Sequence, residues 1–145
     1  MANKTYAKEW LLFSKKNLDT AKLLFDVNHY EDIIGVELQQ SLEKLLKSLM
    51  ANENIKIPKF HDLVALYYTV DNFISLKEDE IILLKLATDY YKEDRYPNPN
   101  YYLPSNEEIK KVLDFTQELF DKVCDILDIE KVNSQYLTSK RTIKR

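Results

Sequence analysis

The hydrophobic pattern of the chain is organised around one long stretch, residues 30–52, which predicts a central helix. At about 100° per residue, its apolar positions form one continuous face made of Ile34, Leu38, Leu42, Leu45 and Leu49. Four polar side chains fall together on the opposite side of this helix, namely Gln40, Glu43, Lys44 and Lys47. The pattern is compatible with two interpretations of that polar group, a solvated face or a site built on a rigid helix.

Four further helices are predicted around this one, over residues of about 5–27, 63–73, 77–91 and 106–127. Two of them begin at recognisable caps. Asp62 is the expected N-cap of the third helix, and Ser105 with Glu108 forms the expected capping box of the last one. The short break at residues 28–29 predicts that the first two helices form an antiparallel hairpin.

The same spacing predicts which side chains of the outer helices point inward. In the first helix these are Ala7, Trp10, Leu11, Ser14, Leu18, Ala21 and Phe25. The other side of that helix is expected to carry Lys15, Lys16, Asp19, Lys22 and Asp26. The inward positions of the last helix are expected to be Ile109, Val112, Thr116, Leu119, Val123 and Ile126.

Gly35 is the only glycine of the chain and lies inside the central helix. Glycine at such a position costs about 1 kcal/mol relative to alanine, so we expect a compensating close approach by another helix. That helix belongs either to the same chain or to a partner subunit. Together with the apolar Ile33 and Val36, Gly35 predicts a two-fold homodimer.

Composition favours an all-α domain, because one glycine and four prolines in 145 residues are few for a sheet-rich fold. We predict an up-and-down bundle of about five helices over residues 1–128 and a basic tail, mobile in part, over 129–145. Residues 131–145 carry five basic side chains and no acid, so the other 130 residues hold 16 basic and 24 acidic ones, a net charge of -8. Such an acidic body is not expected to bind duplex DNA.

Cys124 is the only cysteine, which excludes an intramolecular disulfide and a cysteine-based metal cluster. It lies in a helical pattern between apolar residues, so a packed thiol is expected. No secretory signal pattern is visible at the N-terminus, and no run approaches the ~20 apolar residues of a membrane span. These features predict a soluble, cytoplasmic protein that does not bind membranes.

No strong catalytic or metal-binding motif is present, but polar residues recur in three segments. These are the polar group of the central helix, His61 with Asp62 before the third helix, and Arg95 with Tyr96 after the fourth. Taken singly, each has a structural explanation: His61 can pack at a helix end, and Arg95 can pair with a neighbouring acid. The seven candidate ligand-binding residues are Gln40, Glu43, Lys44, Lys47, His61, Arg95 and Tyr96.

Taken together, these segments resemble the HEPN domain, a helical bundle named for nucleotide binding in higher eukaryotes and prokaryotes. The resemblance covers nearly all of residues 6–127. It rests on Trp10-Leu11 with Leu18 and Ala21, on the stretch from Gln40 to Leu49, on His61-Asp62-Leu63 and on Arg95-Tyr96-Pro97. It implies a helical bundle, often a homodimer, whose partner is often a minimal nucleotidyltransferase in a two-component or toxin–antitoxin module.

The chain departs from the ribonuclease members of the wider superfamily, which carry Arg followed by four to six residues and then His. Asn100, Tyr101 and Tyr102 occupy the positions where that histidine would follow Arg95. The usual acid–base partner for cleaving RNA is therefore missing, and we expect a binding subunit without catalytic residues or a cofactor, with a nucleotide as candidate ligand. The alternatives are an RNA-cleaving toxin with a non-standard site that uses His61 and Arg95, and a pure protein-interaction subunit.

Overall fold

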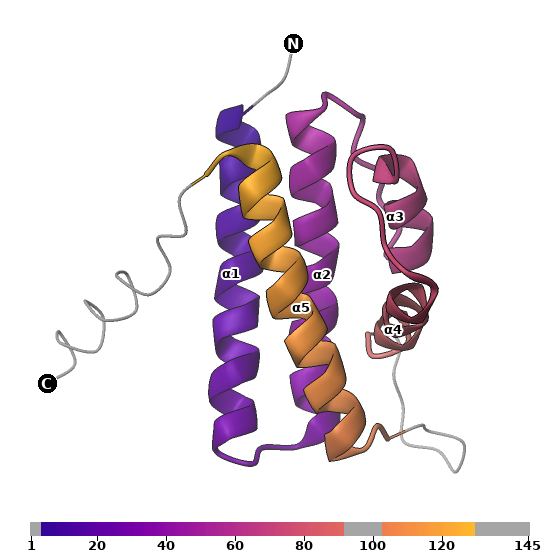
Figure 1. The fold of residues 1–145 in the computed structure, drawn as a ribbon. Coiled ribbons are helices and arrows are strands. Elements are labelled where there is room, and N and C mark those ends of the chain that lie inside the picture. The colour runs from indigo at the N-terminus through magenta and orange to yellow at the C-terminus, as the bar shows by residue number, and fades with distance from the viewer. Residues whose placement is uncertain (1–3, 92–102, 130–145) are drawn as a thin grey trace, which may run out of the picture.

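A computed structural model describes residues 4–91 and 103–129 of the chain. These ranges contain five helices and no strand: α1 Lys4–Asp26, α2 Glu31–Asn52, α3 Leu63–Val70, α4 Glu78–Thr88 and α5 Asn106–Leu127 (Figure 1). The predicted all-α, five-helix fold is confirmed. Arg95, Tyr96 and the basic tail from residue 130 onward lie outside the described residues.

The helices are arranged around α2, which contacts each of the other four. Figure 1 shows α1 and α2 side by side and antiparallel, joined by the short connection that the sequence predicts. In the same view α5 lies across this pair and runs in the same sense as α2, while α3 and α4 pack on the opposite side of α2. Among the described helices, none combines the length and the apolar character that crossing a membrane requires.

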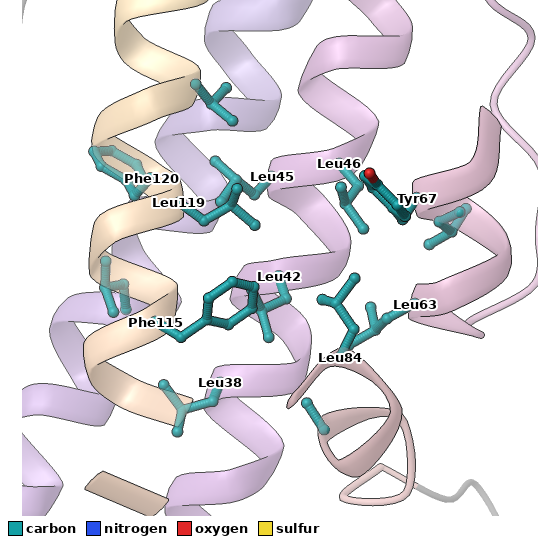
Figure 2. Packing of buried hydrophobic residues seen from close by; sticks show 14 of the residues in the cluster. Leu38, Leu42, Leu45, Leu46, Leu63, Tyr67, Leu84, Phe115, Leu119 and Phe120 are labelled. Atoms are coloured by element: carbon teal, nitrogen blue, oxygen red, sulfur yellow. The ribbon is translucent and has the colours of Figure 1, made fainter. Parts of the chain in front are cut away.

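The core is built on the leucines of α2, and Figure 2 shows that they point to two sides. Leu42 lies beside Phe115 and Leu45 beside Leu119 of α5, whereas Leu46 points toward Tyr67 of α3. All five residues of the predicted apolar face are fully buried. Fourteen of the 22 residues of α2 are buried, against ten of 22 in α5 and six of 23 in α1. The prediction of a central helix over residues 30–52 is confirmed, and α2 is the most buried of the five described helices.

Some predicted boundaries and orientations are wrong. The third helix ends at Val70 and the fourth at Thr88, both three residues earlier than expected. Ile126 is partly exposed, and Leu127 is buried in its place because it lies about five helical turns after Ile109. Lys15 is buried rather than solvated, and its ammonium pairs with Asp19. Helix α5 runs along this side of α1, where Lys4 and Lys22 donate hydrogen bonds to Leu127 and Gln117.

Both predicted N-caps are present. The carboxylate of Asp62 accepts hydrogen bonds from the backbone N–H groups of Val64 and Ala65, at 3.0 and 3.1 Å. The hydroxyl of Ser105 accepts one from the N–H of Glu108 at 3.1 Å. This is the Ser105 half of the predicted capping box, whereas the carboxylate of Glu108 accepts a hydrogen bond from the hydroxyl of Tyr90. These caps satisfy helix donors that have no partner inside the helix, so they fix where α3 and α5 begin. The thiol of Cys124 is buried, as the sequence predicts.

Gly35 is covered from within the same chain. A Cβ atom built on Gly35 would lie 2.9 Å from Cγ of Tyr90, the second residue after the end of α4. Tyr90 is 3% exposed and its hydroxyl donates a hydrogen bond to Glu108 of α5, so its ring has little freedom to move. The close approach that the glycine predicts is therefore intramolecular, and Gly35 no longer supports a homodimer.

We predict that Gly35→Ala lowers the free energy of unfolding by about 1–3 kcal/mol, because overpacking against Tyr90 outweighs the better helix propensity of alanine. In a Tyr90→Ala background the ring is gone, and the same substitution should raise that free energy by up to about 1 kcal/mol. Urea unfolding followed by circular dichroism measures both values. The same sign in both backgrounds would contradict this account of Gly35.

Candidate functional site

The carboxylate of Glu43 is the centre of a buried polar cluster between α2 and the loop that precedes α3. It accepts hydrogen bonds from Nε2 of Gln39 at 3.0 Å, from Nζ of Lys47 at 2.7 Å and from Nδ1 of His61 at 2.9 Å. Gln39, Glu43 and Lys47 are spaced four residues apart, so one line of α2 carries all three. His61 comes from a segment 18 residues away, which the tertiary structure brings to this line.

The predicted polar side of α2 is not a solvated face. Glu43 and Lys47 are each only 6% exposed. Trp10 of α1 lies beside them, with its ring centroid 5.7 Å from Nζ of Lys47, close enough for a cation–π interaction. Because a buried charge without a partner is strongly destabilising, the ion pair and its added hydrogen bonds are what permit α2 to be buried on this side.

The environment of Glu43 stabilises its charged form. Burial raises the pKa of this carboxyl, but hydrogen bonds from Lys47, Gln39 and His61, with the positive charge of Lys47, outweigh burial and leave the pKa below its ordinary value. Burial lowers the pKa of the neighbouring Lys44, against the opposite effect of Glu37 and Glu43. The cluster therefore keeps a negative charge on Glu43 at neutral pH.

Gln40 and Lys44 lie at the edge of this cluster and are half-buried. Nε2 of Gln40 donates to Oε1 of Gln39 at 2.7 Å, which joins Gln40 to the cluster. Nζ of Lys44 instead donates to Oδ1 of Asn17 in α1 at 2.7 Å. In turn, Asn17 donates to Glu37 at 2.8 Å, so Lys44 belongs to the contact between α1 and α2.

His61 joins the buried cluster to the surface. Its side chain is 43% exposed, whereas the carboxylate that it contacts is almost fully buried. Because the charged carboxylate can only accept, Nδ1 of His61 carries the proton, and Nε2 is the acceptor of the neutral ring. The ring of Tyr91 meets the imidazole edge-to-face, with centroids 5.5 Å apart. The candidate site is thus an oriented imidazole beside an aromatic ring.

The structure brings together four of the seven predicted site residues, and it places Lys44 in a neighbouring network. Glu43, Lys47 and His61 contact one another directly, and Gln40 is linked to them through Gln39. Arg95 and Tyr96 lie outside the described residues. In the sequence, Arg95 follows Tyr91, whose ring meets that of His61, by four residues.

Sequence reasoning missed Gln39, Trp10 and Tyr91 as parts of this cluster. Gln39 had a usable signal, because it lies four residues before Glu43 on the same line of α2. Trp10 and Tyr91 had none, since only the packing of α1 and the end of α4 brings them here. Within residues 4–91 and 103–129, no group of three or more His, Cys, Asp or Glu side chains is placed to hold a metal ion.

A comparison with protein families identifies the family of this chain. The model of the HEPN domain matches residues 7–131 of the chain. The chain belongs to the HEPN family. This match runs from Ala7 in α1 past the end of α5, and it includes every residue of the cluster around Glu43. No curated protein matches the chain.

Two solved structures share the fold of this HEPN chain. The protein TT1696 from Thermus thermophilus superposes with a TM-score of 0.69 at 23% identity, over 83% of this chain and 97% of the other. ST0689, described as an archaeal HEPN homologue, gives a TM-score of 0.65 at 16% identity over the same shares of the two chains. At these identities the two structures support the five-helix fold and say nothing about a ligand.

We predict that Glu43→Gln lowers the free energy of unfolding by about 3 kcal/mol at pH 7, because it removes one charge of a buried ion pair. The pKa of Glu43 in the folded state is lower than the value of 4.5 expected in the unfolded state. The charge of Glu43 therefore stabilises the fold above pH 4.5, and this stabilisation is lost as the pH falls through the folded-state pKa. The difference between wild type and variant should therefore shrink as the pH falls below 4.5. Urea unfolding at several pH values measures it.

The matched control for that experiment is Glu118→Gln, which makes the same chemical change at an exposed position of α5. Its effect should be within about 0.5 kcal/mol at every pH. A constant difference between wild type and Glu43→Gln from pH 7 to pH 3 would show that the charge of Glu43 does not stabilise the fold.

Proposed function

We propose that this HEPN-domain protein is a non-catalytic binding subunit that holds a nucleotide, or a phosphate group of a partner, at the surface where His61 emerges. One observation carries the proposal: a buried carboxylate orients His61 beside Tyr91, and the Arg95–Tyr96 segment begins four residues after Tyr91. Cations and an imidazole in one place suit a compact anion. Aromatic rings beside them suit a base.

The seven candidate residues take different roles in this proposal. Arg95 holds phosphate oxygens in a bidentate manner, and His61 donates to them when it is protonated. Tyr96 stacks against the base, and Gln40 offers its amide at the edge of the cluster. Glu43 and Lys47 are positioning residues, because their buried pair holds His61 in place. Lys44 adds positive charge nearby, bound to Asn17.

The partners in this proposal are a second copy of the chain and a minimal nucleotidyltransferase, as in a two-component toxin–antitoxin module. Membership of the HEPN family supports both partners, because such modules recur in the family. The acidic body of the chain, with a net charge of -8 outside residues 131–145, argues against duplex DNA. A small anion needs only a local group of cations, and in this proposal Arg95 and a protonated His61 supply it, with Lys44 nearby.

We predict that Arg95→Ala abolishes nucleotide binding while the helical signal in circular dichroism stays unchanged. Binding is measured by titrating the protein with ATP, GTP and AMP and following the fluorescence of Trp10, the only tryptophan, which lies against Lys47. The affinity of the wild-type protein should fall with salt, because exposed charges are screened over about 8 Å at physiological ionic strength.

Arg145→Ala is the matched control, since it removes an arginine from the end of the tail. It should leave the nucleotide affinity unchanged. If Arg95→Ala binds as tightly as the wild-type protein, or if no nucleotide binds the wild-type protein at millimolar concentration, the proposed site is wrong.

RNA cleavage is the second candidate function, and the contact between Glu43 and His61 is the observation that favours it. A carboxylate that orients an imidazole through Nδ1 is the arrangement used by many general bases. In such a reaction Nε2 of His61 would take the proton of a ribose 2′-hydroxyl, and Arg95 would stabilise the negative charge that develops on phosphorus oxygens. The missing histidine after Arg95 is the reason why binding remains our first choice.

Under this second candidate, we expect the purified protein to cleave single-stranded RNA, and His61→Ala to lower the rate at least a hundredfold. Labelled RNA oligomers resolved on a gel measure the rate. His29→Ala is the matched control, because it removes the only other histidine, at the turn between α1 and α2. Equal rates for both variants would mean that any activity comes from elsewhere or from a contaminant.

A further inference from the structure

The outer side of α1 exposes an unusual amount of apolar surface. The described residues include thirteen large hydrophobic side chains that are exposed, and five of them belong to α1 or to the residue that follows it. These five, which we call the α1 outer face, are Tyr6, Leu12, Phe13, Leu23 and Val27, exposed by 43%, 45%, 48%, 61% and 62%. Single exposed apolar residues are normal, but a concentration on one helix marks an interaction surface.

The spacing of this face is that of a helix with a helical partner. Tyr6, Phe13 and Val27 are separated by seven and fourteen residues, which keeps them on one side of the helix. The opposite side of α1 carries the buried Ala7, Leu11 and Leu18, which pack in the core. Among the described helices, α1 packs mainly against α2 and α5, and both leave its outer face exposed.

The charged residues of this face are arranged about Phe13. Glu9 lies four residues before Phe13 and Lys16 three residues after it, and both are exposed. Nζ of Lys16 lies 5.5 Å from the centroid of the Phe13 ring. The order along the helix is therefore acid, aromatic ring, base, at almost equal intervals.

We infer that the α1 outer face docks against the same face of a second copy, with the two α1 helices antiparallel and Phe13 next to the two-fold axis. A two-fold contact must be complementary to itself, and this order of residues meets that condition. When Phe13 faces Phe13 of the partner subunit, Glu9 faces Lys16 of the partner subunit, and Lys16 faces the partner's Glu9. The contact thus has an aromatic centre flanked by two equal ion pairs.

Self-complementarity selects a second copy over an unrelated protein as the occupant of this face. An unrelated partner would need no acid and base at matched intervals about one aromatic residue. The inference rests on the homodimer in the proposed function. It assigns the dimer interface to the α1 outer face instead of the region around Gly35, which Tyr90 covers. It does not depend on whether the site at His61 binds a nucleotide.

The test is a charge swap measured by sedimentation equilibrium on the full chain. Glu9→Lys and Lys16→Glu should each raise the dissociation constant of the dimer roughly tenfold or more, because a two-fold interface contains each contact twice. The double variant should restore the wild-type value to within about threefold. Lys8→Glu, the same charge change at an exposed position outside the α1 outer face, is the matched control and should have little effect.

A second variant keeps the test decisive if a charge variant folds poorly. Phe13→Cys in a Cys124→Ser background should form a disulfide-linked dimer under mild oxidation, whereas Ile82→Cys, at an exposed position of α4, should not. A wild-type protein that stays monomeric overturns both the homodimer and this interface. A dimer insensitive to the single charge variants and not cross-linked through Phe13→Cys overturns the interface alone. If the charge variants weaken only the binding of a co-expressed nucleotidyltransferase, the face belongs to that partner and the inference is wrong.

Discussion

The charge of Glu43, held inside the bundle, is the constraint on which the rest of this structure depends. Helix α2 contacts all four other helices, so its polar side is buried together with its apolar side. A carboxylate in that position is tolerated only when donors surround it. Lys47 and Gln39 come from the same helix, but the third donor, His61, comes from the loop before α3. The loop before α3 is therefore held in place by its hydrogen bond to Glu43, since the buried charge on α2 needs His61 as a donor.

Two pairs of neighbouring residues, His61 with Asp62 and Tyr90 with Tyr91, set the geometry of the site around Glu43. His61 contacts Glu43 while Asp62 caps α3, so the start of α3 is fixed relative to α2. At the end of α4, the ring of Tyr90 lies on Gly35, and the ring of Tyr91 meets His61. Because both tyrosines contact residues on or next to α2, the chain leaves α4 beside the exposed imidazole. The contacts of Tyr90 and Tyr91 thus fix the path of the chain after α4, up to residue 91.

The surface chemistry separates two parts of the molecule. The α2 side, with His61 and Tyr91, combines an oriented polar group with an aromatic ring, which suits a small anion that carries a base. The α1 outer face combines exposed apolar residues with one acid and one base, which suits another helix. In the two proposals above, the first surface holds the ligand and the second forms the dimer. Lys44, Asn17 and Glu37 form a hydrogen-bonded contact between α1 and α2.

The sequence by itself determined the number of helices, the central position of residues 30–52 and the N-caps at Asp62 and Ser105, because periodicity and capping are local properties. It also marked Glu43, Lys47 and His61 as candidates, through resemblance to the HEPN domain. It did not determine that Glu43 and Lys47 are buried, since the burial of a polar helix face depends on what packs against it. Only the tertiary structure joined His61 to Glu43, put Trp10 over Lys47, buried Lys15 and gave Gly35 its partner Tyr90. These contacts link segments 18 to 55 residues apart, and no local pattern encodes such pairs.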